Sequence, residues 1–284
     1  MDKVTIFYHN DHDGICAAAI VLQHFPGAKC YTAKYQRSLR TEEIEDGQMV
    51  YIVDFTPEPI EELIGLYKKC GKNLIWIDHH KSAIKAEKEY NLQDIQGVRT
   101  NGTSGCELTW TFLNGGPRPQ IVHHLGRFDV WDHKEKDTVP CEYGMRIKNP
   151  RPDSPIWGKL LNHNVETDLL INSIISDGYI AYDFEQSQNK KIINSQVYPI
   201  IFKGYKSAVI NRAYMSTLHF KDLKNKDDYD LFIWYYYDKD HWEVRVATEK
   251  DNINVLDICE PRGGGGHEKI GGFRVDDISE FIID

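Results

Sequence analysis

Four clusters of aspartate and histidine residues occur in the first half of this 284-residue chain. In chain order they are His9-Asn-Asp11-His-Asp13-Gly14, Asp54, Asp78-His79-His80 and Asp129. A spacing of i, i+2 and i+4 in an extended loop can direct the first three ligands at one point. Carboxylates mixed with imidazole suit Mn²⁺ or a similar divalent ion, whereas a closed zinc site more often uses thiolates. Together the clusters supply enough ligands for two metal ions about 3.5–4 Å apart, the arrangement that assists phosphoryl hydrolysis.

Each cluster also has a structural interpretation when it is considered alone. Asp11 and Asp13 could shape a turn and cap the next helix, which is the commoner role of an isolated Asp-x-Asp-Gly. Asp54 could hydrogen-bond a turn, and the pair His123-His124 is interpreted as structural. The four clusters nevertheless fall within one predicted domain, and three of them fall at predicted strand ends. This conjunction favours a metal site over four separate explanations.

The elements that must position these side chains alternate between buried strands and helices. Apolar runs predict strands over residues 4–8, 50–54 and 74–78, and helices over residues 15–25 and 59–70. Such alternation predicts βαβ units and a largely parallel sheet. In open α/β sheets ligands bind at the carboxyl ends of the strands, which is where the clusters fall.

The second half of the sequence predicts a smaller domain. A helix is expected over residues 166–197, followed by a hairpin of residues 231–237 and 242–247. We therefore expect an α/β fold with a parallel-sheet, metal-binding catalytic domain at residues 1–190 and a linker helix to about residue 203. A smaller α+β domain follows at residues 204–284, and the active site is expected in the cleft between the two domains.

A run of glycines distinguishes the smaller domain. It lies in the sequence Arg262, Gly263, Gly264, Gly265, Gly266 and His267. Backbone N–H groups in such a loop can approach an anion closely, and Arg262 and His267 can add positive charge. The alternative interpretation is a flexible surface loop, which would explain a run of glycines about as well when the run is considered alone.

Three other features have two interpretations each. Ser104 could bind phosphate at a helix N-terminus, but a capping box with Glu107 explains it better. Trp131 is expected to pack in the core beside Asp129. The aromatic run at residues 234–237 is interpreted first as core and second as a platform for stacked bases.

The composition restricts the class of partner. A net charge of −9 and a pI of about 5.7 lack the basic excess that long nucleic acids usually require, which favours a small phosphorylated substrate. Six cysteines without a CxxC pair predict reduced thiols in a cytoplasmic protein. No apolar run approaches the roughly 20 residues that a membrane-spanning helix needs, so no membrane association is expected. The oligomeric state is left open, with a homodimer among the alternatives.

The ordered series of motifs resembles the DHH phosphoesterase superfamily. The sequence Gly263-Gly-Gly-Gly-His267, followed by Gly271-Gly-Phe273, resembles the DHHA1 domain that accompanies it, so the resemblance covers nearly the whole chain. Within the superfamily, His9-Asn-Asp11-x-Asp13-Gly14 and Asp129-Val-Trp131 look most like the nanoRNase B-type oligoribonucleases.

The resemblance implies a role for each matching residue. One Mn²⁺ would be held by His9, Asp11 and Asp54, and a second by Asp13, Asp54, His79 and Asp129. Asp54 would bridge the pair, while the assignment of Asp11 and Asp13 to one ion or the other stays open. Asp78 would orient a neighbouring histidine, and His80 would face the scissile phosphate or protonate the leaving oxygen. The family also has an arginine before the glycine loop, for which Arg245 is the candidate although its spacing is a few residues long.

The activity that the resemblance implies is hydrolysis of short oligoribonucleotides to nucleoside 5′-monophosphates by water that two metal ions activate. Alternatives with the same chemistry are linear dinucleotides, cyclic nucleotides, 3′-phosphoadenosine 5′-phosphate and single strands cut by an exonuclease. A catalytically inactive nucleotide-binding module is a further alternative, and its mark would be a missing ligand. No ligand is missing from the four clusters.

Overall fold

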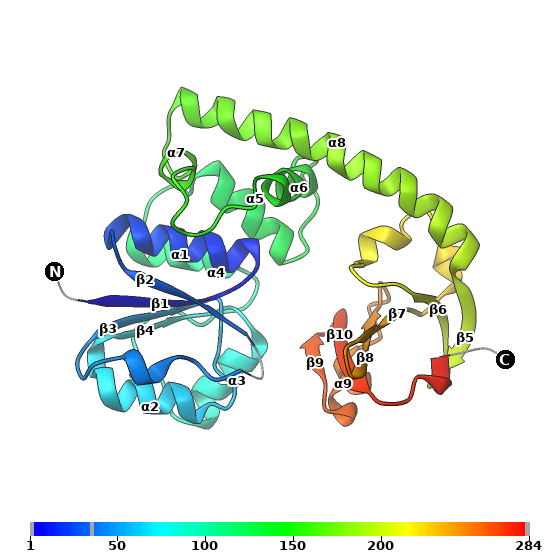
Figure 1. Ribbon diagram of the computed structural model, residues 1–284, viewed down its shortest axis with the longest axis horizontal. Coiled ribbons are helices and arrows are strands. Elements are labelled where there is room, and N and C mark those ends of the chain that lie inside the picture. Colours follow the sequence, from blue (N-terminus) through cyan, green and yellow to red (C-terminus); the bar gives the residue numbers. More distant parts are fainter. Residues whose placement is uncertain (1–2, 35–36, 282–284) are drawn as a thin grey trace. The chain divides into compact units, whose positions relative to one another are not determined.

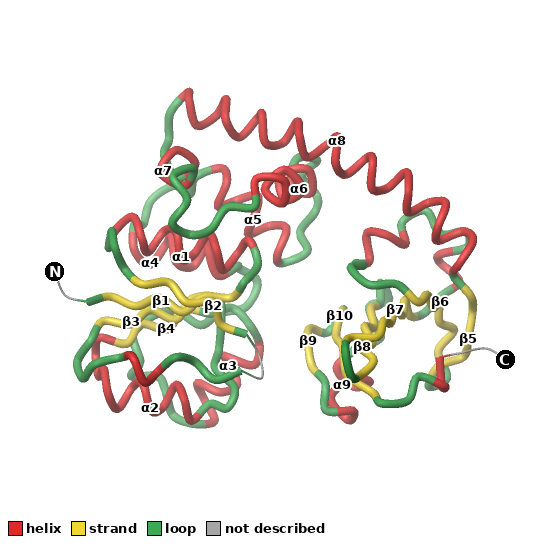
Figure 2. Tube along the Cα trace, viewed as in Figure 1, coloured by secondary structure: helices red, strands yellow, loops and turns green. Residues whose placement is uncertain are grey.

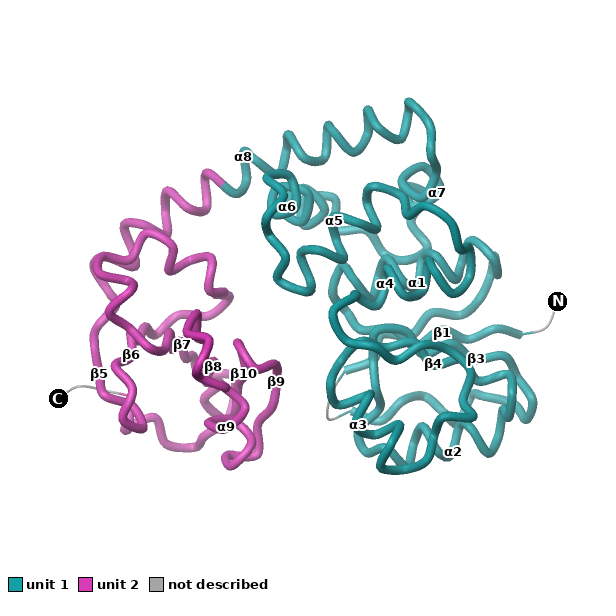
Figure 3. Tube along the Cα trace, turned by 180° about the vertical axis from the view of Figure 1, so that it is seen from behind, with its two compact units in different colours: residues 1–182 teal, residues 183–284 magenta. Residues whose placement is uncertain are grey.

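A computed structural model describes residues 3–34 and 37–281. The chain forms two compact units, residues 1–182 and residues 183–284, which Figure 3 shows in different colours. Each unit has its own β-sheet, and the two sheets are drawn in yellow in Figure 2.

The first unit contains a four-stranded parallel sheet with helices on both faces (Figure 1). Its strand order is β2 (Lys29–Ala33), β1 (Val4–His9), β3 (Met49–Val53) and β4 (Leu74–Ile77). One face is covered by α1 (His12–His24) and α4 (Gly105–Leu113), and the other by α2 (Glu61–Cys70) and α3 (Lys81–Glu89). Because strand side chains alternate, Ile6 and Tyr8 belong to the core on one face and Phe7 to the core on the other.

Additional helices extend the first unit on the α1 side of the sheet. They are α5 (Gln120–Asp129), α6 (Thr138–Lys148), α7 (Trp157–Leu160) and the first part of the long α8 (Val165–Gln196). The parallel-sheet prediction is confirmed, and the expected strands and helices correspond to β1, β3, β4, α1, α2 and α8. The strand β2 was not predicted, because four of the five residues of this edge strand are exposed or only partly buried and form no apolar run.

The second unit contains a mixed six-stranded sheet. Its order is β5 (Tyr198–Phe202), β6 (Tyr205–Asn211), β7 (Leu231–Asp238), β8 (His241–Ala247), β10 (Ile270–Val275) and β9 (Gly265–His267). Only β6 and β7 are parallel neighbours. The predicted hairpin is confirmed as β7 and β8, and the glycine run continues into the edge strand β9. The boundary between the units lies within α8, and β5, which the sequence assigned to the linker, belongs to this sheet.

Short helices complete the structure. They are α9 (Leu256–Cys259) and six 3₁₀ turns at Thr41–Glu43, Gly71–Asn73, Thr217–Phe220, Lys226–Asp228, Glu260–Arg262 and Ser279–Phe281. None of the helices in the described residues is long and apolar enough to cross a membrane.

Candidate metal centre and nucleotide pocket

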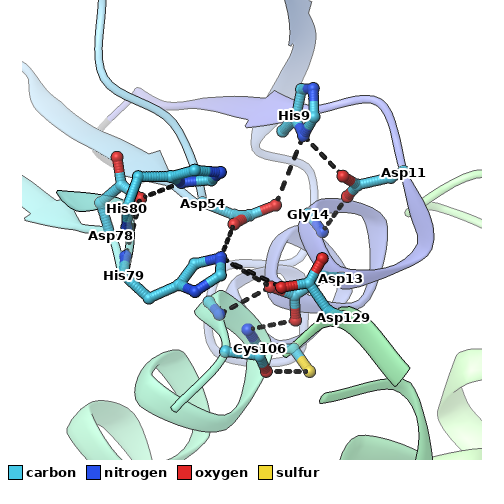
Figure 4. Close-up of polar contacts among 12 residues, drawn as sticks. His9, Asp11, Asp13, Gly14, Asp54, Asp78, His79, His80, Cys106 and Asp129 are labelled. Carbon is cyan, nitrogen blue, oxygen red and sulfur yellow. Dashed lines mark hydrogen bonds and ion pairs between the residues drawn. The ribbon is translucent and has the colours of Figure 1, made fainter. Parts of the chain in front are cut away.

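The parallel sheet brings the expected metal ligands together at one edge (Figure 4). His9 ends β1, Asp54 follows β3 and His79 follows β4, so all three lie at the carboxyl ends of neighbouring strands. Asp13 lies in the first turn of α1, and Asp129 is the last residue of α5. The site therefore draws on three strands and two helices spread over residues 4–129.

The first group of ligands consists of His9, Asp11 and Asp54. His9 Nδ1 lies 2.6 Å from Asp11 Oδ2 and 3.7 Å from Asp54 Oδ2. Burial favours the neutral imidazole, but the contacts with Asp11 and Asp54 outweigh it and raise the pKa of His9 to about 11. Asp11 also accepts a hydrogen bond from the backbone N–H of Gly14, 2.9 Å away, and so caps α1 as its turn interpretation required.

The second group surrounds the imidazole of His79. Its Nε2 lies 3.2 Å from Asp54 Oδ1, 3.2 Å from Asp129 Oδ2 and 3.9 Å from Asp13 Oδ2. Burial and the charge of Asp13 raise the pKa of both Asp54 and Asp129 well above the ordinary value. Asp54 belongs to both groups, because its two oxygens face His79 and His9 respectively.

Unsatisfied polar atoms test whether these residues fit a metal ion. Both carboxylate oxygens of Asp54 and Nε2 of His79 are buried and make no well-formed hydrogen bond within the described chain. Asp54 also holds its backbone at a φ of 56°, a conformation that is costly for a residue with a Cβ. Buried carboxylates of like charge are unfavourable unless a cation or donor compensates them. The donor set of carboxylates and imidazoles therefore suggests divalent metal ions.

The N-terminus of α4 holds Asp13. The carboxylate of Asp13 accepts hydrogen bonds from the backbone N–H groups of Gly105, at 2.6 Å, and Cys106, at 2.8 Å. Ser104 is fully buried and forms the capping box with Glu107. The alternative that Ser104 binds phosphate is therefore not supported, because a carboxylate of the protein already occupies this anion-favouring helix terminus.

Asp78 holds His80 in a fixed orientation. Asp78 Oδ1 accepts hydrogen bonds from the backbone N–H groups of His79 and His80 and lies 2.6 Å from His80 Nδ1. Thr56 Oγ1 donates a 2.6 Å hydrogen bond to the other oxygen, Oδ2. Burial alone would lower the pKa of His80, but the contact with Asp78 outweighs it and raises that pKa. Asp78 therefore fixes the imidazole of His80 through Nδ1.

A separate pocket of about 360 Å³ lies within the second unit. It is lined by Tyr214, Met215, Trp234, Tyr236, Arg245, Gly265, Gly266, His267, Ile270 and Gly271. Arg245 pairs with Trp234 on β7 and with Gly272 on β10. A Cβ at Gly272 would lie 2.7 Å from Arg245 Cδ, so glycine leaves space for the arginine side chain. The structure thus brings Arg245 to the glycine loop even though its sequence spacing is long.

Three other residues expected to bind substrate do not line this pocket. Arg262 forms a two-pronged ion pair with Glu280, with N–O distances of 3.1 and 3.0 Å. Its guanidinium also lies over the rings of Phe202 and Phe273. Gly263 and Gly264 precede β9 and are absent from the lining. The positive charge of Arg262 is therefore paired with Glu280 of the protein itself.

The sequence did not indicate the positions of two aromatic residues. Trp131 was expected in the core, but 44% of its surface is exposed. Tyr214 lines the pocket and was not singled out, because it lies in an irregular segment with no periodic pattern. Both residues take a positive φ, which depends on the turn in which they lie. The residue types alone therefore do not indicate where the two side chains lie.

A comparison with protein families matches residues 3–140 to the DHH family, N-terminal domain. This range contains all six expected metal ligands together with Asp78 and His80. Residues 3–140 belong to the DHH family of phosphoesterases.

Relatives of this DHH phosphoesterase extend the match beyond the first unit. Oligoribonuclease NrnB of Bacillus subtilis (strain 168) is 22% identical, and the match covers 98% of this chain and 74% of that protein. A pGpG-specific phosphodiesterase from Vibrio cholerae has a similar structure, with a TM-score of 0.52, 10% identity and coverage of 98% and 94%. The exonuclease RecJ bound to manganese gives a TM-score of 0.50 at 14% identity, with coverage of 99% and 87%. These structures confirm the fold of a parallel α/β domain, a long helix and a mixed-sheet domain.

Proposed function

We propose that this protein is a phosphodiesterase that uses two divalent metal ions, with Mn²⁺ the best candidate, to hydrolyse short oligoribonucleotides to nucleoside 5′-monophosphates. The observation that carries the proposal is the placement of Asp54 between the two ligand groups. Its oxygens face His9 on one side and His79 on the other, and both are buried without a well-formed hydrogen bond. A carboxylate in this position suits the bridge between two ions.

The proposed roles follow from the positions of the ligand groups. One ion would be held by His9, Asp11 and Asp54, and the other by Asp13, Asp54, His79 and Asp129. When bound, such ions lower the pKa of a coordinated water and offset the negative charge of the phosphodiester.

His80 is suited to proton transfer at the leaving oxygen. The contact with Asp78 raises the pKa of His80, which favours the protonated imidazole, and Asp78 fixes the ring through Nδ1. The opposite nitrogen, Nε2, would then donate the proton to the leaving oxygen. A positioned histidine acid of this kind contributes on the order of 10²–10⁴-fold to a rate.

The pocket of the second unit is suited to one nucleotide. Its volume of about 360 Å³ falls at the small end of ligand pockets. Arg245, His267 and the backbone of Gly265 and Gly266 offer donors to a phosphate, and the ring of Tyr236 offers a surface to a base. Phosphate recognition and an aromatic wall in one pocket support a nucleotide ligand.

A short substrate is favoured over a long one. The chain has a net charge of −9, so it lacks the cationic excess that supports long nucleic acids. The relative from Bacillus subtilis is named an oligoribonuclease, and the structure from Vibrio cholerae a phosphodiesterase for the dinucleotide pGpG. A linear dinucleotide is therefore the second candidate, and it falls within the same size class.

Hydrolysis of a 5′-labelled RNA ladder in Mn²⁺, from dinucleotides to a long oligomer, tests the proposal. Fast cleavage of the shortest members, slower cleavage with length and loss of cleavage in Asp54→Ala are expected. Equal or faster cleavage of the longest member would instead indicate a processive exonuclease. No cleavage of any member would overturn the proposed substrate class.

A further inference from the structure

The backbone of Trp131 is unusual for a tryptophan. Helix α5 ends at Asp129, and the N–H of Trp131 donates to Phe128 O at 3.2 Å while the N–H of Asp132 donates to Arg127 O at 2.9 Å. These two bonds form a Schellman motif, in which Trp131 takes the left-handed position with a φ of 60°. Glycine is the usual residue there because a Cβ is disfavoured. The backbone therefore gives no reason to have tryptophan at this position.

Packing does not explain the side chain either. The indole is 44% exposed, although tryptophan is usually well buried. One neighbour is the imidazole of His133, whose ring centre lies 5.1 Å away. His133 stacks on Phe128 at 5.0 Å and donates from Nε2 to Phe128 O at 3.1 Å. Trp131 thus has a fixed aromatic support and a large apolar surface left open in the first unit.

The position of Trp131 relates it to the metal centre. Asp129 directs its carboxylate into the ligand cluster, where Oδ2 lies 3.2 Å from His79 Nε2 (Figure 4). Trp131 follows two residues later, so its Cα lies within about 7 Å of that of Asp129. An indole side chain adds enough length to meet a group bound next to the metal ligands.

We propose that Trp131 is a stacking platform for the nucleobase beside the phosphodiester bond that is cut. The inference rests on the proposed function, because it requires a nucleotide substrate at the metal centre. Every base has a flat π-face, so such a platform binds the substrate without selecting its sequence. A platform in the first unit would be distinct from the pocket that contains Tyr236 and Arg245.

Removal of single bases from the substrate tests this proposal. In Trp131→Ala, KM for an intact RNA dinucleotide is expected to rise about tenfold, in line with the loss of one base–aromatic stack. Trp131→Phe keeps a flat ring and should restore most of the affinity. For a dinucleotide that lacks the stacked base, the wild type and Trp131→Ala should have the same KM. An equal loss on the intact and base-free substrates would overturn the proposal.

Trp131→Gly separates binding from stability. Glycine suits the left-handed position, so the variant should keep or raise the Tm while its KM rises as in Trp131→Ala. A merely structural tryptophan would instead give a lower Tm and an unchanged KM.

Binding of a non-hydrolysable RNA dinucleotide to the full chain distinguishes the two proposals. Weaker binding in Trp131→Ala, without cleavage by the wild type, would overturn the proposed function alone. Cleavage by the wild type with unchanged binding in the variant would overturn the stacking platform alone.

Discussion

Asp54 Oδ1 lies 3.2 Å from His79 Nε2, and neither of these buried atoms makes a well-formed hydrogen bond within the described chain. The contact stands at the centre of a cluster that includes three further carboxylates. Such a cluster of like charges destabilises the fold when no cation is bound. Cations that bind the native state alone shift the unfolding equilibrium and stabilise the fold.

Asp54→Asn should therefore change stability in opposite directions with and without metal. In EDTA the variant is expected to have a higher Tm than the wild type, because one buried acid is removed from a like-charged cluster. Addition of Mn²⁺ should raise the Tm of the wild type and change the Tm of the variant little. Thermal unfolding measured in both solutions checks this, with Asp46→Asn as the control because Asp46 is exposed. A full Mn²⁺-induced gain in Asp54→Asn would contradict the bridging role.

The pairing of Asp78 with His80 predicts a pH effect. The pKa of His80 is raised, so the charged form persists above the ordinary histidine pKa and is lost as pH rises through the raised value. In Asp78→Asn the alkaline limb of the kcat profile should move to lower pH, because the contact that raises the pKa of His80 is lost. The profile of kcat against pH in Mn²⁺ measures the shift. An unchanged alkaline limb would show that His80 does not supply the proton.

The contrast between Arg245 and Arg262 separates substrate binding from stability. Arg245 lines the pocket of the second unit, is half exposed and lies 3.6 Å from Glu243 Oε2. Arg262 is mostly buried and forms a closer ion pair with Glu280, at 3.0 Å. Arg245→Ala should raise KM about tenfold or more, the loss expected for a charge-assisted phosphate contact, with little change in Tm. Arg262→Ala should lower Tm and leave KM almost unchanged. Steady-state kinetics and thermal unfolding of both variants test the assignment. A lower Tm in Arg245→Ala and a higher KM in Arg262→Ala would refute it.

Gly105 should not tolerate a methyl group. A Cβ at this residue would lie 2.5 Å from Asp54 Cβ, so alanine must displace either Asp54 or the start of α4. Since α4 also holds Asp13, we expect Gly105→Ala to lose Mn²⁺ affinity and activity together. Gly65→Ala is the matched control, because nothing lies near its Cβ in α2 and alanine there should stabilise by about 0.5–1 kcal/mol. Metal titration and thermal unfolding of both variants check the prediction. Unchanged Mn²⁺ affinity in Gly105→Ala would refute it.

The sequence predicted the elements whose pattern is local. The runs before Asp54 and Asp78 are apolar without interruption, which is typical of strands buried on both faces, and they form β3 and β4. The strand β2 lacks such a run, because an edge strand can be half exposed. The spacing of a capping box also identified the start of α4 correctly.

The placements that sequence could not predict depend on contacts between distant residues. Asp13 meets the start of α4 through hydrogen bonds to Gly105 and Cys106, and no local pattern encodes that pairing. Arg262 adjoins the glycines in sequence, but Glu280 and two phenylalanine rings determine where its side chain lies. Trp131 was expected in the core because of its apolar side chain, yet the turn after α5 exposes it.

The distribution of the ligands also bears on synthesis of the protein. Asp129 is the last of the six to leave the ribosome, and it takes its place only when α5 has folded against the rest of the first unit. Any nascent chain that ends before this helix holds an incomplete set of ligands. We therefore expect full metal affinity only at the end of the folding of the first unit, once α5 has brought Asp129 to the other ligands.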